Sequence, residues 1–169
     1  MTDALFLTSE AVDDLATPAD YVAAVRDGYR EVGEGAPAEP RTLLPSGDPP
    51  GMLTTYVAML PEVGAMGGYT YAAGFAERDA WFLTPLFDAE TGEPLAVIDG
   101  ASMNPFKTGA AGAVAVDALA RPDASTVAVI GSGPQARGQL RTMATVRDPP
   151  GVRGAAPPPC HPAHSTRRR

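Results

Sequence analysis

The segment that most limits the fold of this chain is "VIGSGPQA" at residues 129–136. The apolar run before it, Thr126–Ile130, is typical of a buried strand, and Pro134 suits the first turn of a helix over residues 134–147. In a G-x-G-x-x-A pattern the first glycine makes the tight turn, the second lets the backbone approach a pyrophosphate, and the small third residue lets helix and strand pack closely. The pattern therefore predicts the strand–turn–helix unit that opens a nucleotide-binding α/β domain.

The residues before this unit predict a mixed series of helices and strands. Thr17, Pro18 and Asp20 resemble a capping box at the start of a helix that ends at Gly33 or Gly35, with Tyr29 in its buried face. Asn104 is expected to cap a second helix, rich in Ala and Gly, with Pro105 in its first turn. The expected strands are residues 4–7, runs within 41–74, and a hairpin formed by 81–87 and 95–98.

Residues 149–169 differ in composition from the rest of the chain. Six of the 21 are proline and none is Leu, Ile, Met or aromatic, so we expect a disordered tail that is out of frame or otherwise aberrant. Cys160, His161 and His164 fit no common zinc spacing, and no metal site is predicted. Because only 33 residues follow Ala136, the α/β domain is expected to be incomplete.

Charge and hydropathy bear on location and partners. The net charge is −7, and residues 1–148 alone carry nine basic and twenty acidic side chains, a formal −11. Such a surface repels phosphate backbones, so no nucleic-acid partner is expected. No apolar run approaches the ~20 residues of a membrane span, and no basic region precedes the short apolar patch near the N-terminus. We therefore expect no membrane association and a cytoplasmic location.

Several stretches together resemble the ornithine cyclodeaminase/mu-crystallin family over nearly all of residues 1–148. They are "EPRTLLP", "GMLTTYVAMLP", "LFDAETGEPLAVIDG" and "FKTGAAGAVAVDALARPDASTVAVIGSGPQA". The resemblance implies an α+β dimerisation domain, a Rossmann domain that binds NAD or NADP, and hydride exchange with the α-carbon of an amino or imino acid. It also implies a homodimer, and a catalytic aspartate that lies downstream of residue 148, so no catalytic residue is assigned.

The resemblance also assigns site residues. Arg41 aligns with an arginine that binds the substrate carboxylate, for which a guanidinium offers two parallel donors. Lys107 aligns with a second arginine of the family; lysine keeps the charge and loses the bidentate fork. Tyr69 falls where the family commonly has a lysine. The resemblance places the cofactor at Gly131, Ser132, Gly133, Pro134, Gln135 and Ala136. The acid that would separate NAD from NADP is expected about 20 residues further on, within the tail.

The sequence thus predicts an α+β dimerisation and substrate domain at 1–104, a linking helix at 105–122, a partial Rossmann domain at 123–148 and a disordered tail at 149–169. Two functional hypotheses follow. One is an NAD(P)-dependent enzyme of cyclodeaminase, alanine dehydrogenase or ketimine reductase type. The other is a non-catalytic fragment, at most a dimerising or small-ligand-binding module, because a single strand–turn–helix unit does not enclose a dinucleotide.

Overall fold

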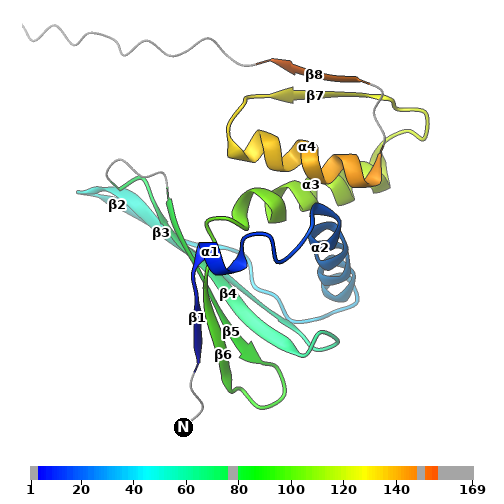
Figure 1. Ribbon diagram of the computed structural model, residues 1–169. Helices are drawn as coiled ribbons and strands as arrows, with labels where there is room; N and C mark the ends of the chain where they lie inside the picture. Colours follow the sequence, from blue (N-terminus) through cyan, green and yellow to red (C-terminus); the bar gives the residue numbers. More distant parts are fainter. Residues whose placement is uncertain (1–3, 76–79, 148–150, 156–169) are drawn as a thin grey trace, which may run out of the picture.

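The computed structural model describes residues 4–75, 80–147 and 151–155. It is a mixed α/β structure in which a sheet stands below a group of helices, and a strand pair lies on the far side of those helices (Figure 1). The elements are β1 Leu5–Leu7, α1 Ser9–Val12, α2 Pro18–Gly33, β2 Thr42–Gly47, β3 Pro50–Leu60, β4 Ala65–Ala73, β5 Ala80–Asp88, β6 Pro94–Asp99, α3 Asn104–Leu119, β7 Thr126–Ile130, α4 Pro134–Val146 and β8 Gly151–Ala155.

The larger sheet has six strands in the order β1-β6-β5-β4-β3-β2. Its neighbours are antiparallel except for β1, which pairs parallel with β6 at the edge. Strand β4 pairs with β3 along its whole length, from Ala73 opposite Met52 to Ala65 opposite Leu60. The expected strands at 4–7, within 41–74, and in the 81–98 hairpin are all present.

Helix α2 begins as its sequence predicts. The Thr17 hydroxyl oxygen accepts a hydrogen bond from the Asp20 N–H at 3.3 Å, and the Asp20 carboxylate accepts one from the Thr17 N–H at 2.8 Å. This reciprocal pair satisfies two donors that a helix start otherwise leaves free. The expected burial of Tyr29 is wrong, because its side chain is 57% exposed; Val22 is the residue of this helix that enters the core.

Helix α3 spans the expected region, but the prediction for its cap is wrong. Asn104 is the first helical residue, and Met103 stands at the N-cap position without a side-chain hydrogen bond. The Asn104 side chain instead accepts a hydrogen bond from the Tyr69 hydroxyl, at 2.9 Å. Capping rules predict that the Asn104 side chain binds the backbone of its own helix; here it binds Tyr69 on the sheet instead.

Helices α3 and α4 pack against each other in parallel, through small residues. A Cβ atom added to Gly109 would lie 2.6 Å from the Gly138 carbonyl oxygen, and one added to Gly138 would collide with the carbonyl oxygen of Pro105. Further along, Arg147 donates a hydrogen bond to the Asp117 carbonyl. The two helices therefore begin at the same end of the pair (Figure 1). The core beside them consists of Val22, Ala110 and Ala113, with Tyr21, Val25, Val114, Met143 and Val146 packed around it.

The second sheet corrects the prediction for the start of the tail. Strand β8 pairs parallel with β7, from Thr126 opposite Gly151 to Ile130 opposite Ala155. The prediction of disorder is therefore wrong for residues 151–155, and one edge of β7 is paired with them. The physical reason is that these five residues, "GVRGA", form a proline-free window in which every backbone N–H can pair. The remaining tail, including Cys160, His161 and His164, lies outside the described residues.

Candidate functional site

Two cations and three tyrosine rings meet on the face of the large sheet that lies toward α3. The Lys107 ammonium donates a hydrogen bond to the Tyr56 hydroxyl at 2.7 Å, and its Nζ lies 4.0 Å from the centre of the Tyr69 ring. The Arg41 guanidinium carbon lies 5.5 Å from the centre of the Tyr56 ring and 5.9 Å from that of Tyr71. We call these five residues the Arg41–Lys107 cluster. The structure brings together the two residues that the sequence assigned to the substrate.

Strand geometry places the tyrosines on one face. Tyr69 and Tyr71 are two residues apart on β4, so their side chains point the same way. Tyr56 lies directly opposite Tyr69 on β3, and Phe82 lies opposite Tyr71 on β5. Neighbouring rings are in contact, with centroids 5.4 to 5.9 Å apart. The result is an aromatic floor that the sheet's register fixes, with Tyr69 buried in it.

The electrostatics of the cluster favour an anion. Neither Arg41 nor Lys107 forms an ion pair with a carboxylate of the described residues. Burial lowers the pKa of Lys107, and the Arg41 charge acts in the same direction, while Tyr71 opposes it. Burial raises the pKa values of Tyr56 and Tyr69, so both phenols are held in the neutral form. A carboxylate entering here would meet two positive charges and neutral hydroxyl groups.

Asn104 completes the support of this cluster from α3. Its side-chain oxygen accepts a hydrogen bond from the Tyr69 hydroxyl, which ties the sheet to the first turn of the helix that carries Lys107. Asn104, Tyr56 and Tyr71 were not among the residues predicted for the site. The signal for Tyr71 was present in the alternation of β4, whereas Tyr56 and Asn104 required the strand register and the helix position.

The glycine turn between β7 and α4 has the conformation that its sequence predicts. Gly131 has a φ of +109°, a backbone angle that residues other than glycine rarely adopt. Gly133 occupies the N-cap position of α4. The residues 132–135 are exposed, and Pro134 stands in the first helical turn. None of the backbone N–H groups of Ser132, Gly133, Gln135 and Ala136 donates a hydrogen bond to a described residue.

This turn fits a pyrophosphate. A Cβ atom added to Gly131 or Gly133 would meet no protein atom within 4 Å, so the space beside the backbone is open. Free N–H groups at the start of a helix, together with the helix dipole, favour an anion there. Of the six residues assigned to the cofactor, 131–136, Ser132, Gly133, Gln135 and Ala136 therefore have backbone N–H groups available to an anion, whereas Pro134 has none.

The packing of α3 against α4 places the turn and the cluster at the same end of the helix pair. Gly138, in the second turn of α4, contacts Pro105, which lies two residues before Lys107. Arg141 of α4 also lies over the Phe106 ring, with its guanidinium carbon 5.8 Å from the ring centre. The glycine turn and the cationic cluster are thus attached to adjacent helix N-termini.

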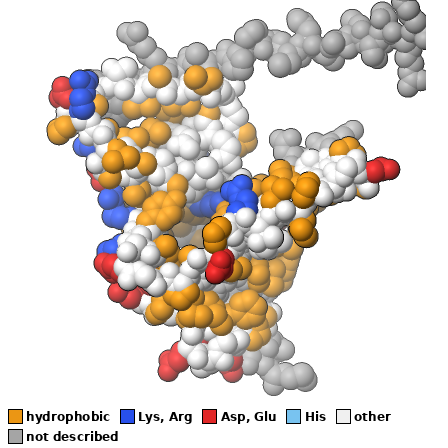
Figure 2. All heavy atoms as spheres, turned by 180° about the vertical axis from the view of Figure 1, so that it is seen from behind, with side chains coloured by type: hydrophobic (Ala, Val, Ile, Leu, Met, Phe, Trp, Pro, Cys, Tyr) orange, Lys and Arg blue, Asp and Glu red, His pale blue; other side chains and the backbone are white. Residues whose placement is uncertain are grey.

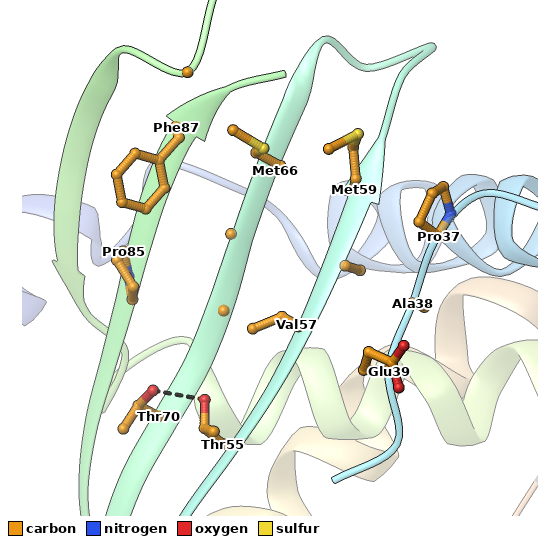
Figure 3. Close-up of a pocket in the computed structure, with 14 residues that line it drawn as sticks. Pro37, Ala38, Glu39, Thr55, Val57, Met59, Met66, Thr70, Pro85 and Phe87 are labelled. Carbon is orange, nitrogen blue, oxygen red and sulfur yellow. Dashed lines mark hydrogen bonds between the residues drawn. The ribbon is translucent and has the colours of Figure 1, made fainter. Parts of the chain in front are cut away.

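The opposite face of the large sheet carries an apolar groove of about 700 Å³. Val57, Met59, Met66, Pro85 and Phe87 line it, and the side chains of Thr55 and Thr70 form a hydrogen bond across its floor (Figure 3). Because side chains alternate along a strand, Val57 and Tyr56 point to opposite faces, so this groove is separate from the Arg41–Lys107 cluster. Seen from behind, hydrophobic side chains gather over the sheet and basic side chains lie near the middle of the molecule (Figure 2).

The described part of the chain contains neither a cluster of metal-ligating side chains nor a membrane-spanning helix. No group of three or more His, Cys, Asp or Glu residues there could hold a metal ion. No helix there is both long and apolar enough to cross a membrane.

Comparison with known proteins identifies the fold and then the family. In the archaeal alanine dehydrogenase dimer with bound NAD, the matched region is 31% identical, with a TM-score of 0.81 over 90% of this chain and 48% of that one. The Δ(1)-pyrroline-2-carboxylate reductase of Thermococcus litoralis, in complex with NADH and L-proline, is 25% identical, with a TM-score of 0.83 over 92% of this chain and 50% of that one. The fold is therefore the mixed α/β fold of alanine dehydrogenase-like proteins.

The sequence comparisons agree. The model of the ornithine cyclodeaminase/mu-crystallin family matches residues 2–153, and the chain belongs to this family. The NAD(P)H-dependent anabolic L-arginine dehydrogenase of Pseudomonas aeruginosa is 32% identical over 160 residues, which are 90% of this chain and 50% of that protein. The chain spans about half the length of the relatives it matches. The family match also continues past residue 148, where the sequence predicted that the family pattern breaks off.

Proposed function

We propose that this chain carries the substrate-carboxylate site and the pyrophosphate turn of an NAD(P)-dependent enzyme that acts on the C–N centre of an amino or imino acid. The observation that carries this proposal is the pair of cations, Arg41 and Lys107, held over the Tyr56 ring without a carboxylate partner among the described residues. The relatives that support it are dehydrogenases, reductases and a cyclodeaminase of amino and imino acids.

Each residue has a defined task under this proposal. Arg41 presents a planar pair of N–H donors to the substrate carboxylate, and Lys107 adds a second charge beside the same Tyr56 ring. The Tyr56 hydroxyl fixes the direction of the Lys107 ammonium. The N–H groups of the 131–136 turn hold the pyrophosphate of the dinucleotide. The nicotinamide of the bound dinucleotide supplies or accepts the hydride.

We further propose that residues 1–104 form a dimerisation and substrate domain, and that 105–122 link it to the Rossmann segment beginning at 123. A second copy would cover the face of the sheet that carries the apolar groove. Leu53, Val57, Trp81 and Leu83 on that face are each between 45% and 58% exposed, which is unusual for large apolar side chains grouped on one sheet. The alanine dehydrogenase with the same fold is a dimer.

Calorimetric titration of the 169-residue chain tests the two anchoring sites separately. NADH and NADPH probe the turn, and pyrrole-2-carboxylate, a flat and redox-inert carboxylate, probes the cluster. We expect Arg41→Gln to weaken carboxylate binding at least about tenfold, which corresponds to ~1.4 kcal/mol, and to leave dinucleotide binding unchanged. Arg121→Gln, an exposed arginine paired with Asp123 after α3, is the matched control.

Turnover is measured apart from binding, as the loss of the nicotinamide absorbance with pyruvate plus ammonia or with cyclic imino acids. Carboxylate and dinucleotide binding together with turnover would support the enzyme. Binding without turnover would support the second candidate function, a small-ligand-binding module. The absence of carboxylate binding would refute the role given to Arg41 and Lys107.

A further inference from the structure

We infer that the Arg41–Lys107 cluster selects amino or imino acids whose side chains are neutral or acidic and excludes those whose side chains carry a second positive charge. This inference rests on the proposed function, because it assumes that the cluster holds the substrate carboxylate. It goes further by defining the class of side chain that the site accepts. Relatives of this chain include an L-arginine dehydrogenase and an L-lysine cyclodeaminase, whose substrates carry such a second charge.

The first step of the argument concerns the aromatic rings. A floor of tyrosine rings ordinarily attracts a ligand cation to the ring faces. Here the protein's own cations already occupy them: Lys107 lies over Tyr69 and Tyr56, and Arg41 lies over Tyr56 and Tyr71. A ligand ammonium approaching the floor would therefore meet the Lys107 ammonium or the Arg41 guanidinium instead of a free ring face.

The second step concerns charge. Burial lowers the pKa of Lys107; the Tyr71 phenol opposes this shift, and the positive charge of Arg41 adds to it, so the two cations of the cluster repel each other. The described residues place no carboxylate in ion-pair contact with either cation. One substrate carboxylate neutralises a single charge of the pair, so the cluster keeps a net positive charge after the carboxylate is bound. A second carboxylate on the substrate would find this remaining charge, and a second ammonium would be repelled by it.

The third step concerns Tyr69, which occupies the centre of the floor. Its side chain is only 9% exposed, its hydroxyl is bound to Asn104, and its ring carries Lys107 at 4.0 Å. The position offers a ligand no negative charge, and its hydroxyl hydrogen is already donated to Asn104. Tyr69 therefore contributes to specificity indirectly, because it holds Lys107, and Lys107 repels a basic substrate side chain.

Three ligands that differ only at the end of the side chain test the inference. L-Norleucine, L-lysine and L-2-aminoadipate share the α-ammonium and α-carboxylate groups, and their side chains end in a methyl, an ammonium and a carboxylate. Calorimetric titration of the 169-residue chain gives their dissociation constants. We expect lysine to bind at least about tenfold more weakly than norleucine, and aminoadipate to bind at least as tightly as norleucine.

The measured quantity is the ratio of the dissociation constants of lysine and norleucine. The contribution of the α-carboxylate is common to both ligands and cancels in this ratio. Rising potassium chloride should shrink this ratio, since screening weakens charge repulsion. Lys107→Met should also shrink it, and Lys107→Arg, which keeps the charge, should preserve it. A melting curve of each variant checks that it folds, and the salt series tests the same point on the unaltered chain.

The outcomes separate the two proposals. Equal affinity for norleucine and lysine would overturn this inference and leave the carboxylate site intact. A large ratio that does not respond to salt would also overturn it, because the discrimination would then have a steric origin. If pyrrole-2-carboxylate and all three amino acids fail to bind, the proposed function is refuted, and this inference falls with it.

Discussion

The Lys107 ammonium on α3 donates a hydrogen bond of 2.7 Å to the hydroxyl of Tyr56 on β3. The ring of the same tyrosine lies beneath Arg41, whose guanidinium carbon is 5.5 Å from the ring centre. Tyr56 therefore contacts both cations of the cluster, one through its hydroxyl and the other through its ring. The protonation state of Lys107 consequently decides how much positive charge the sheet presents to a ligand.

Carboxylate binding should fall as the pH rises through the lowered pKa of Lys107. Lysine is charged below its pKa, and burial moves this pKa below the ordinary 10.5, so attraction is present on the acid side and lost on the alkaline side. Lys107→Arg should remove the fall, since a guanidinium stays charged throughout. The affinity for pyrrole-2-carboxylate across an alkaline pH series measures this. A fall that persists unchanged in Lys107→Arg would assign the titration to another group.

Two neighbouring glycines of the cofactor turn should respond differently to alanine. Gly131→Ala forces a side chain onto a φ of +109°, and we expect it to reduce the free energy of unfolding by about 1–2 kcal/mol. Gly133 has a φ of −72° and open space around it, so Gly133→Ala should leave stability within about 0.5 kcal/mol while its methyl group enters the proposed pyrophosphate site.

Denaturant unfolding and NADH titration of both variants check these expectations. Dinucleotide binding should weaken in Gly133→Ala in spite of its intact stability. Full affinity in that variant would show that the pyrophosphate lies elsewhere.

Gly138→Ala should destabilise the helix pair. The added methyl group would collide with the Pro105 carbonyl, which is backbone and cannot rotate away, so α3 and α4 must separate. We expect a loss of about 1–3 kcal/mol in the free energy of unfolding by urea. Gly33→Ala is the matched control: it also lies in a helix, has no atom within 4 Å of the added methyl group, and should be neutral or slightly stabilising. Equal effects of the two substitutions would argue against the close approach.

The capping box of α2 should make stability depend on pH at its acid end. Hydrogen bonds from the Thr17 hydroxyl and backbone N–H lower the pKa of Asp20. A lowered carboxyl pKa stabilises the fold above the unfolded value of 3.8, and this contribution is lost as the pH falls through the lowered pKa. Thr17→Ala should cost about 1 kcal/mol at neutral pH and less in acid. Thr17→Ser keeps the hydroxyl oxygen and should behave as the unaltered chain; thermal melts at both pH values provide the comparison.

Val57→Asp should disrupt the proposed dimer without unfolding the chain. Val57 is 47% exposed and lines the groove on the free face of the sheet, so a charge there is tolerated in a monomer and unfavourable in an apolar interface. Leu15→Asp, at a residue that is 74% exposed and outside the sheet, is the control. Light scattering coupled to gel filtration should give a smaller mass for Val57→Asp alone. A smaller mass for both, or for neither, would contradict the interface.

Local patterns in the sequence predicted most of the elements. The capping box at Thr17 and the glycine turn at Gly131 depend on residues within five positions of each other, and the structure has both. Asn104 failed as a cap because Tyr69, 35 residues away, binds its side chain. The prediction that Tyr29 lies in the core was wrong. Its helical spacing places it near the apolar face but does not show how wide that face is, and α2 buries Val22 instead.

The candidate site was predictable only in part. Arg41 and Lys107 were assigned through family resemblance, and nothing in their spacing of 66 positions indicates that they share a ring. That relationship arises from the β3–β4 register, which sets Tyr56 opposite Tyr69, and from the placement of α3 over the sheet. Strand β8 was missed because the prolines around it dominate the composition of its neighbourhood.

The glycine contact between α3 and α4 has a mechanical consequence. Because backbone atoms of the two helices touch at Gly109 and Gly138, the helix that carries Lys107 cannot slide or tilt against the helix that follows the cofactor turn without a steric clash. We therefore expect Lys107 and the start of α4 to keep a fixed separation. If the protein opens and closes around the proposed ligands, the chain would bend outside this helix pair, and a different separation would require different residues at these two glycines.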